Sequence, residues 1–142
     1  MFTPDDQRYM ARALELAVRG LYTTTPNPRV GCVIVNGAAV IGEGWHEKAG
    51  EAHAEPVALQ AAGAQAAGAT VYVTLEPCAH FGRTPPCVDA LLAAKPARVV
   101  AAMADPNPQT AGEGFARLRA AGIAVDVGLM ADEARELNIG FV

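Results

Sequence analysis

The sequence predicts one three-layer α/β/α domain with a central mixed sheet of about five strands. Its length of 142 residues suits a single domain. Asn36-Gly37 lies between two apolar runs, and this pair is the strongest short signal for an antiparallel hairpin. From residue 70 onward, strand-like and helix-like segments alternate, which is typical of parallel strands with helices on both faces. No internal repeat or linker divides the chain.

The first half of the chain is expected to contain a helix, the hairpin and a second helix. Thr3 can cap the first helix, a proline and two acidic residues suit its first turn, and its apolar spacing stops at Gly20. The hairpin strands cover 30–35 and 39–45. Small apolar residues at helical spacing predict the next helix over 53–67.

In the second half, β-branched apolar runs predict strands, and the segments between them have helical spacing. Two asparagines, Asn27 and Asn107, each lie between prolines and mark loops. The expected elements are a strand over 70–75, a helix over 87–94, a strand over 98–103, a helix over 113–121, a strand over 123–127 and a helix over 131–137.

The composition excludes several partners. With 11 basic and 15 acidic residues the net charge is −4, so a long polyanion such as a nucleic acid is not expected to bind. The N-terminus lacks a signal peptide's basic start, and no apolar stretch approaches the roughly 18 residues of a membrane span. We therefore expect a cytoplasmic protein without a membrane partner. Its three cysteines suit thiols or metal ligands better than a disulfide framework.

The residues that predict chemistry are His53, Glu55, Cys78 and Cys87. Zinc favours imidazole and thiolate ligands, and a catalytic zinc has three protein ligands and an open position for water. His53, Cys78 and Cys87 meet that requirement. A closed structural zinc site is the alternative, and only His80 could supply its fourth ligand. The pattern H-x-E with P-C and a second cysteine is the general signature of zinc deaminases.

Glu55 is predicted to move the protons. It follows His53 by two residues, too close to be a comfortable ligand from the same turn. It can accept a proton from the attacking water, pass it to a ring nitrogen and then protonate the leaving amine. The alternative is an acid favoured by the helix start. Cys32 lies within an apolar strand and is expected to pack in the core.

The longer segment from Pro77 to Cys87 resembles the deaminase domain of the bacterial riboflavin-biosynthesis RibD family. The resemblance implies a cytidine deaminase-like fold, a zinc cofactor and deamination of 2,5-diamino-6-ribosylamino-4(3H)-pyrimidinone 5′-phosphate. Pro56, directly after Glu55, departs from the family pattern. The other matching segments are Thr25-Pro26-Asn27-Pro28, Val30-Gly31, Gly44-Trp45-His46 through Ala49-Gly50, Val73-Thr74-Leu75-Glu76 and Asp105-Pro106-Asn107-Pro108.

The resemblance also implies substrate contacts. Asn27 would meet the pyrimidine, His46 and Asn107 would line the pocket, and Arg83 with His80 would face the ribose phosphate. An arginine suits a phosphate because its planar fork binds two oxygens. Without the resemblance, the two asparagines could simply shape turns, and the histidines and the arginine could be ordinary loop or surface residues.

Relatives usually carry a C-terminal NADPH-dependent reductase domain and commonly self-associate. We therefore expect residues 1–142 to be the deaminase domain, either stand-alone or cut from a longer chain, and to form a homo-oligomer. Two rival functions remain open. One is a cytidine, guanine or tRNA-adenosine deaminase, which the spacing of Cys78 and Cys87 disfavours. The other is a non-catalytic zinc-stabilised binding domain, which has no need of Glu55.

Overall fold

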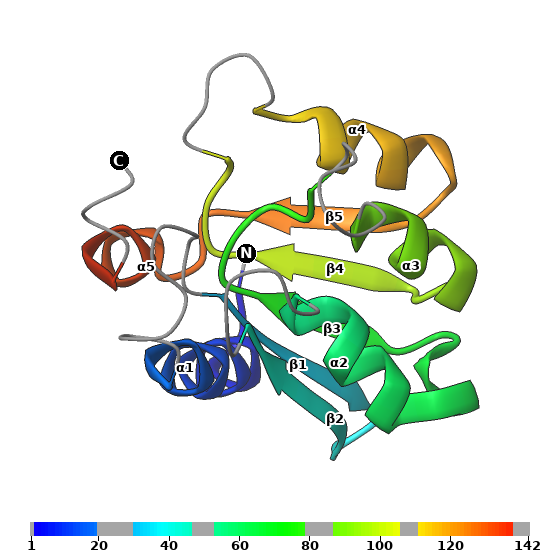
Figure 1. Cartoon of the computed structure of the whole chain (residues 1–142), viewed down its shortest axis with the longest axis horizontal. Helices are drawn as coiled ribbons and strands as arrows, with labels where there is room; N and C mark the ends of the chain where they lie inside the picture. Colours follow the sequence, from blue (N-terminus) through cyan, green and yellow to red (C-terminus); the bar gives the residue numbers. More distant parts are fainter. Residues whose placement is uncertain (1, 20–29, 47–52, 79–86, 106–110, 138–142) are drawn as a thin grey trace.

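Five strands form one mixed sheet in the order β2-β1-β3-β4-β5 (Figure 1). The computed structural model describes residues 2–19, 30–46, 53–78, 87–105 and 111–137. β1 is antiparallel to both β2 and β3, and β3, β4 and β5 run parallel. The predicted hairpin and parallel half are therefore confirmed. The strands are β1 (Gly31–Asn36), β2 (Ala39–Trp45), β3 (Thr70–Val73), β4 (Arg98–Ala101) and β5 (Ala124–Val127).

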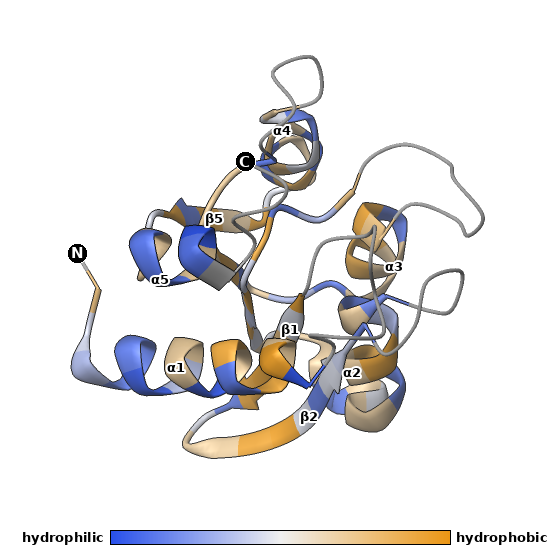
Figure 2. Cartoon of the chain, turned by 60° about the vertical axis from the view of Figure 1, so that its left-hand side comes forward, coloured by the Kyte–Doolittle hydropathy of each residue, from blue (hydrophilic) through white to orange (hydrophobic). Residues whose placement is uncertain are grey.

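Helices cover both faces of this sheet, which confirms the three layers. α1 and α5 lie on one face, and α2, α3 and α4 lie on the other. The separation remains visible after a turn of 60° (Figure 2). Among the described helices, none is both long and apolar enough to cross a membrane. Their bounds are α1 (Pro4–Val18), α2 (Ala54–Ala62), α3 (Cys87–Ala94), α4 (Glu113–Ala120) and α5 (Ala131–Leu137).

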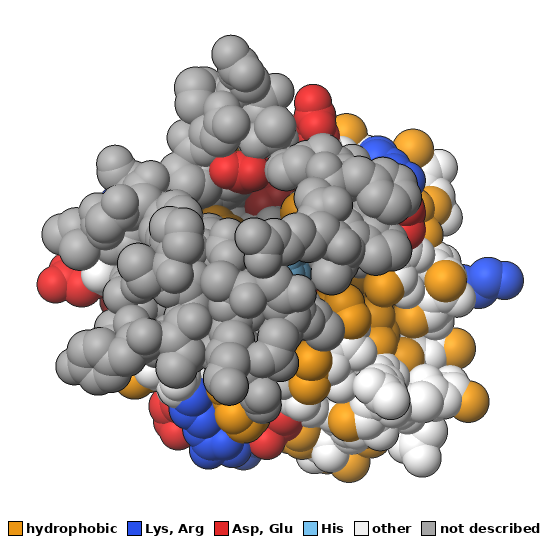
Figure 3. All heavy atoms as spheres, viewed as in Figure 1, with side chains coloured by type: hydrophobic (Ala, Val, Ile, Leu, Met, Phe, Trp, Pro, Cys, Tyr) orange, Lys and Arg blue, Asp and Glu red, His pale blue; other side chains and the backbone are white. Residues whose placement is uncertain are grey.

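The strands point apolar side chains to both faces because both are covered. Ile34, Val71 and Val99 face α2, α3 and α4, whereas Val33 and Val100 face α1 and α5. α1 is amphipathic, and hydrophilic and hydrophobic bands alternate along it in Figure 2. Apolar side chains also gather at the surface over α2 and α3 (Figure 3).

Several element bounds differ from the expectations. The predicted helix over 53–67 is wrong over its last five residues, since α2 ends at Ala62 and a 3₁₀ turn, η1 (Gly63–Ala66), follows it. Gly63 has a φ of 60°, which breaks the α-helical path. β3 and β4 each end two residues before the predicted ends at residues 75 and 103. Helices 87–94 and 131–137 have the expected bounds.

Two glycines of β2 let α2 lie directly on the sheet. A Cβ atom at Gly42 would be 2.3 Å from the Ala58 carbonyl oxygen, and one at Gly44 would be 2.6 Å from that of Ala54. Real Cβ atoms do not approach so closely. The helix backbone therefore packs on the strand backbone, and this close approach sets the height of α2 above the sheet.

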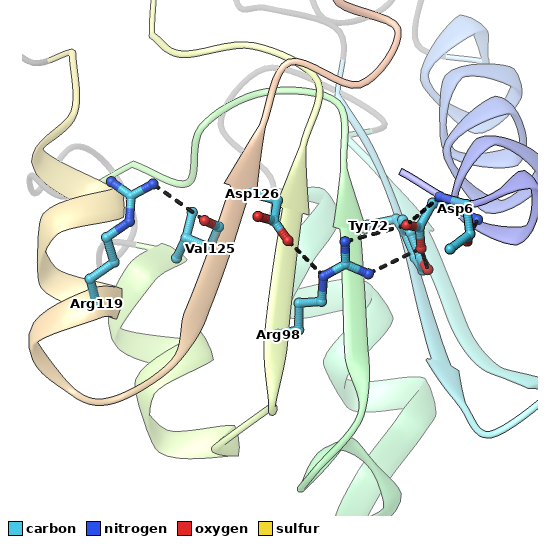
Figure 4. Close-up of polar contacts among 7 residues, drawn as sticks. Asp6, Tyr72, Arg98, Arg119, Val125 and Asp126 are labelled. Atoms are coloured by element: carbon cyan, nitrogen blue, oxygen red, sulfur yellow. Dashed lines mark hydrogen bonds and ion pairs between the residues drawn. The ribbon is translucent and has the colours of Figure 1, made fainter. Parts of the chain in front are cut away.

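A buried carboxylate joins α1 to the middle of the sheet. Asp6 accepts hydrogen bonds at Oδ1 from the Tyr72 hydroxyl at 2.6 Å and from Arg98 Nη1 at 3.1 Å. Arg98 Nη2 and the Thr3 amide donate to Oδ2, at 3.3 and 3.0 Å. Figure 4 shows the Arg98 fork between Asp6 and Asp126. Burial raises the pKa of Asp6, but the bonds from Tyr72, Arg98 and Thr3 outweigh it and lower the pKa to about 2.

Candidate active site

His53 is the cap residue that begins α2. Its backbone is extended, with φ −72° and ψ 173°, and its carbonyl accepts from the Val57 amide at 3.4 Å. The imidazole makes no capping hydrogen bond to α2, and it points to the start of α3. There Nδ1 lies 3.0 Å from the Cys87 sulfur and 3.9 Å from the Cys78 sulfur. The start of one helix therefore meets the start of the next.

Cys78 follows β3, and Cys87 begins α3. The Cys87 amide donates to the Cys78 sulfur at 3.1 Å, and the Val88 amide donates to the Cys78 carbonyl oxygen at 3.0 Å. The first amides of a helix lack intrahelical partners, so a sulfur at this end is stabilised as a thiolate. Both cysteines are thereby held at the carboxyl edge of the parallel strands, where ligands bind in sheets of this kind.

These three side chains fit a zinc ion. Nδ1 of His53 and the sulfurs of Cys78 and Cys87 all lie within 4.8 Å of one another. Zinc binds sulfur at about 2.3 Å and nitrogen at about 2.0–2.1 Å, so tetrahedral ligand atoms lie roughly 3.5–4 Å apart. Two thiolates and an imidazole are also the donors that zinc prefers over magnesium or calcium. Among the described residues, these three are the group able to hold a metal, while His80 lies outside that part of the chain.

The thiols of Cys78 and Cys87 have opposite pKa shifts. A hydrogen bond with Cys87 lowers the pKa of Cys78 to about 4, and the His53 imidazole acts in the same direction. Sharing that bond, together with burial, raises the pKa of Cys87. Zinc would bind these residues as thiolates, so the metal affinity would depend on pH.

Glu55 lies in the first turn of α2 and is buried, with 3% of its surface exposed. Burial raises the pKa of its carboxyl to about 7, and the nearby Cys78 sulfur adds to this effect. A carboxyl with such a pKa can both accept and release a proton near neutral pH. Pro56 follows it inside the first turn, where a helix amide needs no intrahelical partner.

His46 is the predicted pocket residue that the structure brings to this cluster. It follows β2, is buried, and its ring centroid lies 4.9 Å from that of His53. Figure 3 shows histidine atoms near the centre of the same face. The other predicted substrate contacts, Asn27, His80, Arg83 and Asn107, lie outside the described residues.

Two further side chains near the cluster have other roles. Cys32 is fully buried in β1, and burial raises the pKa of its thiol, so it packs in the core as expected. Glu76, between β3 and Cys78, is a buried carboxylate to which the sequence interpretation gave no role. The sequence signal for Glu76 was its position directly after a buried strand and before Pro-Cys, because a charged side chain that is buried there needs hydrogen-bond partners.

Residues 3–103 match the family model described as the cytidine and deoxycytidylate deaminase zinc-binding region. The chain is 64% identical over 137 residues to the riboflavin biosynthesis protein RibD of Escherichia coli, covering 96% of this chain and 37% of that protein. It is 52% identical to the diaminohydroxyphosphoribosylamino-pyrimidine deaminase of Buchnera aphidicola subsp. Schizaphis graminum, covering 96% of this chain and 92% of that protein. The solved structure of Acinetobacter baumannii RibD superposes with a TM-score of 0.95 at 60% identity, covering 96% of this chain and 38% of that one.

The chain thus spans little more than a third of the two RibD proteins but nearly all of the Buchnera deaminase. The zinc cofactor, the enzyme class and the cytidine deaminase-like fold predicted from the sequence are confirmed. On this evidence the chain belongs to the zinc-dependent diaminohydroxyphosphoribosylaminopyrimidine deaminases, the family of the RibD deaminase domain.

Proposed function

We propose that this chain deaminates 2,5-diamino-6-ribosylamino-4(3H)-pyrimidinone 5′-phosphate to the corresponding pyrimidinedione ribotide, an early step of riboflavin biosynthesis. The observation that carries the proposal is the 52% identity to a deaminase of that name over 92% of its length. His53, Cys78 and Cys87 are also gathered as a metal site beside the buried Glu55.

In this reaction a C–O bond forms at the ring carbon that bears the exocyclic amine, and the C–N bond to that amine breaks. His53, Cys78 and Cys87 would hold the zinc ion, which would supply Lewis acidity and lower the pKa of the attacking water towards about 7. Glu55 accepts a proton from the attacking water and gives it to the adjacent ring nitrogen. It then takes the second proton, from the hydroxyl group now bonded to that carbon, and delivers it to the amine, which leaves as ammonia as the C=O bond forms. One carboxylate thus acts first as base and then as acid.

The cluster's surroundings support the role given to Glu55. The carboxyl is inside the protein, where bulk water does not compete for its proton, and the sulfurs that would hold the metal lie beside it. The substrate contacts implied by the resemblance, Asn27, His46, His80, Arg83 and Asn107, stay predictions. The same holds for the homo-oligomer, the cytoplasmic location and the assignment of residues 1–142 as the deaminase domain of a family that also has bifunctional members.

The test is ammonia release from the diaminopyrimidinone ribotide by wild type, Glu55→Gln and Glu133→Gln, each with its zinc content measured. Glu133 is exposed on α5, across the sheet from the zinc ligands, and serves as the matched control. We expect Glu55→Gln to lose at least about 10³-fold in kcat with one zinc per chain retained, and Glu133→Gln to match wild type. A folded, zinc-loaded wild type that releases no ammonia would overturn the substrate assignment, and cytidine and guanine would be assayed next.

A further inference from the structure

His46 is a buried histidine that takes no part in the proton transfers described above. It follows β2 directly, and 3% of its surface is exposed. It lies outside the group of described residues that could hold a metal. The resemblance implies that it lines the substrate pocket, and that role stays a prediction. Its contacts point to a second role, at the proposed metal ligand His53.

The backbone of His46 is held by the sheet. The antiparallel ladder of β1 and β2 pairs Gly31 with Trp45. The His46 amide donates to the Val30 carbonyl oxygen at 3.1 Å, which continues this ladder one residue beyond β2. β1 is in turn hydrogen-bonded to β3, so it is an inner strand. The sheet therefore fixes the point from which the His46 side chain starts.

The side chain of His46 lies on the face of the sheet that α2 covers. Side chains alternate along a strand, so position 46 shares its face with Gly42 and Gly44. A Cβ atom at Gly44 would be 2.6 Å from the Ala54 carbonyl oxygen, so the first turn of α2 lies directly on this end of β2. A full side chain at position 46 consequently meets the residue that precedes Ala54, which is His53.

The two imidazole rings are in contact. Their centroids lie 4.9 Å apart, and their planes are inclined by 56°. Aromatic rings favour tilted contacts with centroids about 4.5–7 Å apart, and such contacts add to the stabilisation that burial gives. His46 contributes a ring whose backbone the sheet holds, and His53 contributes the ring whose Nδ1 lies 3.0 Å from the Cys87 sulfur. The contact therefore joins a fixed side chain to a proposed metal ligand.

The His53 ring needs such a neighbour because its own helix does not fix it. Its side chain makes no capping hydrogen bond to α2. A side chain that is free to change rotamer loses conformational entropy when it binds a metal, and a ring packed against another buried ring has lost much of that entropy beforehand. Groups that orient metal ligands typically raise the metal affinity by about 10- to 100-fold. Contact with His46 therefore favours the rotamer in which Nδ1 faces the two sulfurs.

We propose that His46 is a positioning residue that holds the His53 imidazole in its metal-binding orientation and thereby raises the affinity for zinc. The role depends on the zinc site and is independent of which substrate is deaminated, so it stands even if the proposed function fails. A histidine that only lined the substrate pocket would leave the zinc affinity unaltered. A histidine that only filled space in the core would be replaceable by any apolar side chain of similar size.

Three substitutions of His46 separate these roles. His46→Ala removes the ring, His46→Leu fills similar space without a flat ring, and His46→Phe retains a flat ring. Trp45→Ala is the matched control, because this neighbouring aromatic residue packs against the core cluster on the α1 face of the sheet. The dissociation constant for zinc is measured by competition with a chromophoric chelator. The d–d absorption bands of the cobalt-substituted proteins report the geometry of the metal ligands.

We expect the dissociation constant for zinc to rise at least about tenfold in His46→Ala and His46→Leu. It should rise less than about threefold in His46→Phe and in Trp45→Ala. The cobalt bands should shift in the Ala and Leu variants and keep their wild-type positions in His46→Phe.

Other results would overturn the proposal. A wild-type zinc affinity in both His46→Ala and His46→Leu would leave His46 without a role at the metal ligand. An equal loss in His46→Phe would assign the effect to a ring nitrogen instead of the ring contact. An equal loss in Trp45→Ala would assign it to a general loosening of the end of β2. Failure of all three His46 variants to fold would make this residue a requirement of the whole fold and not of the metal site.

Discussion

Replacing Asp6 by Asn should destabilise the protein by an amount that disappears in acid. The substitution keeps the shape of the side chain and removes the negative charge to which Tyr72 and Arg98 donate hydrogen bonds. The network lies on the α1 face of the sheet, whereas the zinc ligands lie at the starts of α2 and α3. Its loss should therefore affect stability and leave the chemistry unchanged.

The magnitude follows from the pKa of Asp6, which the fold lowers from 3.8 to about 2. One pKa unit corresponds to about 1.4 kcal/mol, so the shift gives an upper bound of about 2.4 kcal/mol at pH 7. Arg98 retains 27% of its side-chain exposure, and solvent screens part of its attraction. We expect a loss of about 1–2 kcal/mol.

The sign of the pH dependence is fixed because the folded pKa lies below the unfolded one. The stabilisation is present above about pH 4 and is lost as the pH falls through about 2. Urea unfolding of wild type and Asp6→Asn at pH 7, 4 and 3 measures this. The gap in unfolding free energy should be nearly the same at pH 7 and 4 and smaller at pH 3. Zinc release in acid affects both proteins and cancels in the difference.

Asp5→Asn is the control, because Asp5 occupies the same first helical turn with a side chain that is 74% exposed. It should alter the free energy of unfolding by less than about 0.5 kcal/mol at every pH. A gap for Asp6→Asn that stays constant from pH 7 to pH 3 would refute the reasoning, since the loss would then come from packing and not from the charge.

Two further pairs of substitutions probe the core beneath the site and the position of α2. Cys32→Ala should retain one zinc per chain and lower the free energy of unfolding by about 1 kcal/mol, whereas Cys87→Ser should lose the metal. Atomic absorption measures the zinc content of both variants. Loss of zinc from Cys32→Ala would contradict the assignment of Cys32 to the core. Gly44→Ala places a methyl group 2.6 Å from the Ala54 carbonyl oxygen, so it should lower the free energy of unfolding by about 1–3 kcal/mol and reduce kcat. The control Val40→Ala lies on the same strand but is 44% exposed, and it should change that free energy by less than about 1 kcal/mol. Thermal melts in which Val40→Ala is the more destabilised variant would disprove the close approach.

The hairpin and the parallel half of the sheet were predictable from the sequence because their signals are local. Asn36-Gly37 specifies the hairpin, and the alternation after residue 70 specifies the parallel half. The end of α2 was mispredicted because alanines continue past Gly63 at helical spacing, and the pattern does not show where the backbone takes a positive φ. The antiparallel pairing of β1 with β3 joins strands that are far apart in the sequence, so no local pattern reports it.

The cluster that could hold a metal was predictable for a different reason. His53, Cys78 and Cys87 are rare residue types at chain positions that enter helices, and zinc chemistry restricts what such a set can do. Glu76 lacked such a signal, because its partners are backbone amides of Asp105, Gly112, Gly114 and Phe115, and any residue type offers an amide. The sequence position of Glu76, a charged residue after a buried strand, indicated that its burial needs hydrogen-bond partners, but only the fold shows which amides they are.

The close approach of Gly42 and Gly44 to α2 limits how this enzyme could be redesigned. His53 and Glu55 stand at the start of that helix, so their depth in the molecule depends on side chains that are missing from a neighbouring strand. Enlarging either glycine would move His53 and Glu55 away from the sheet together. A search for altered substrate specificity should therefore hold positions 42 and 44 fixed and diversify the connections at the carboxyl edge of the sheet.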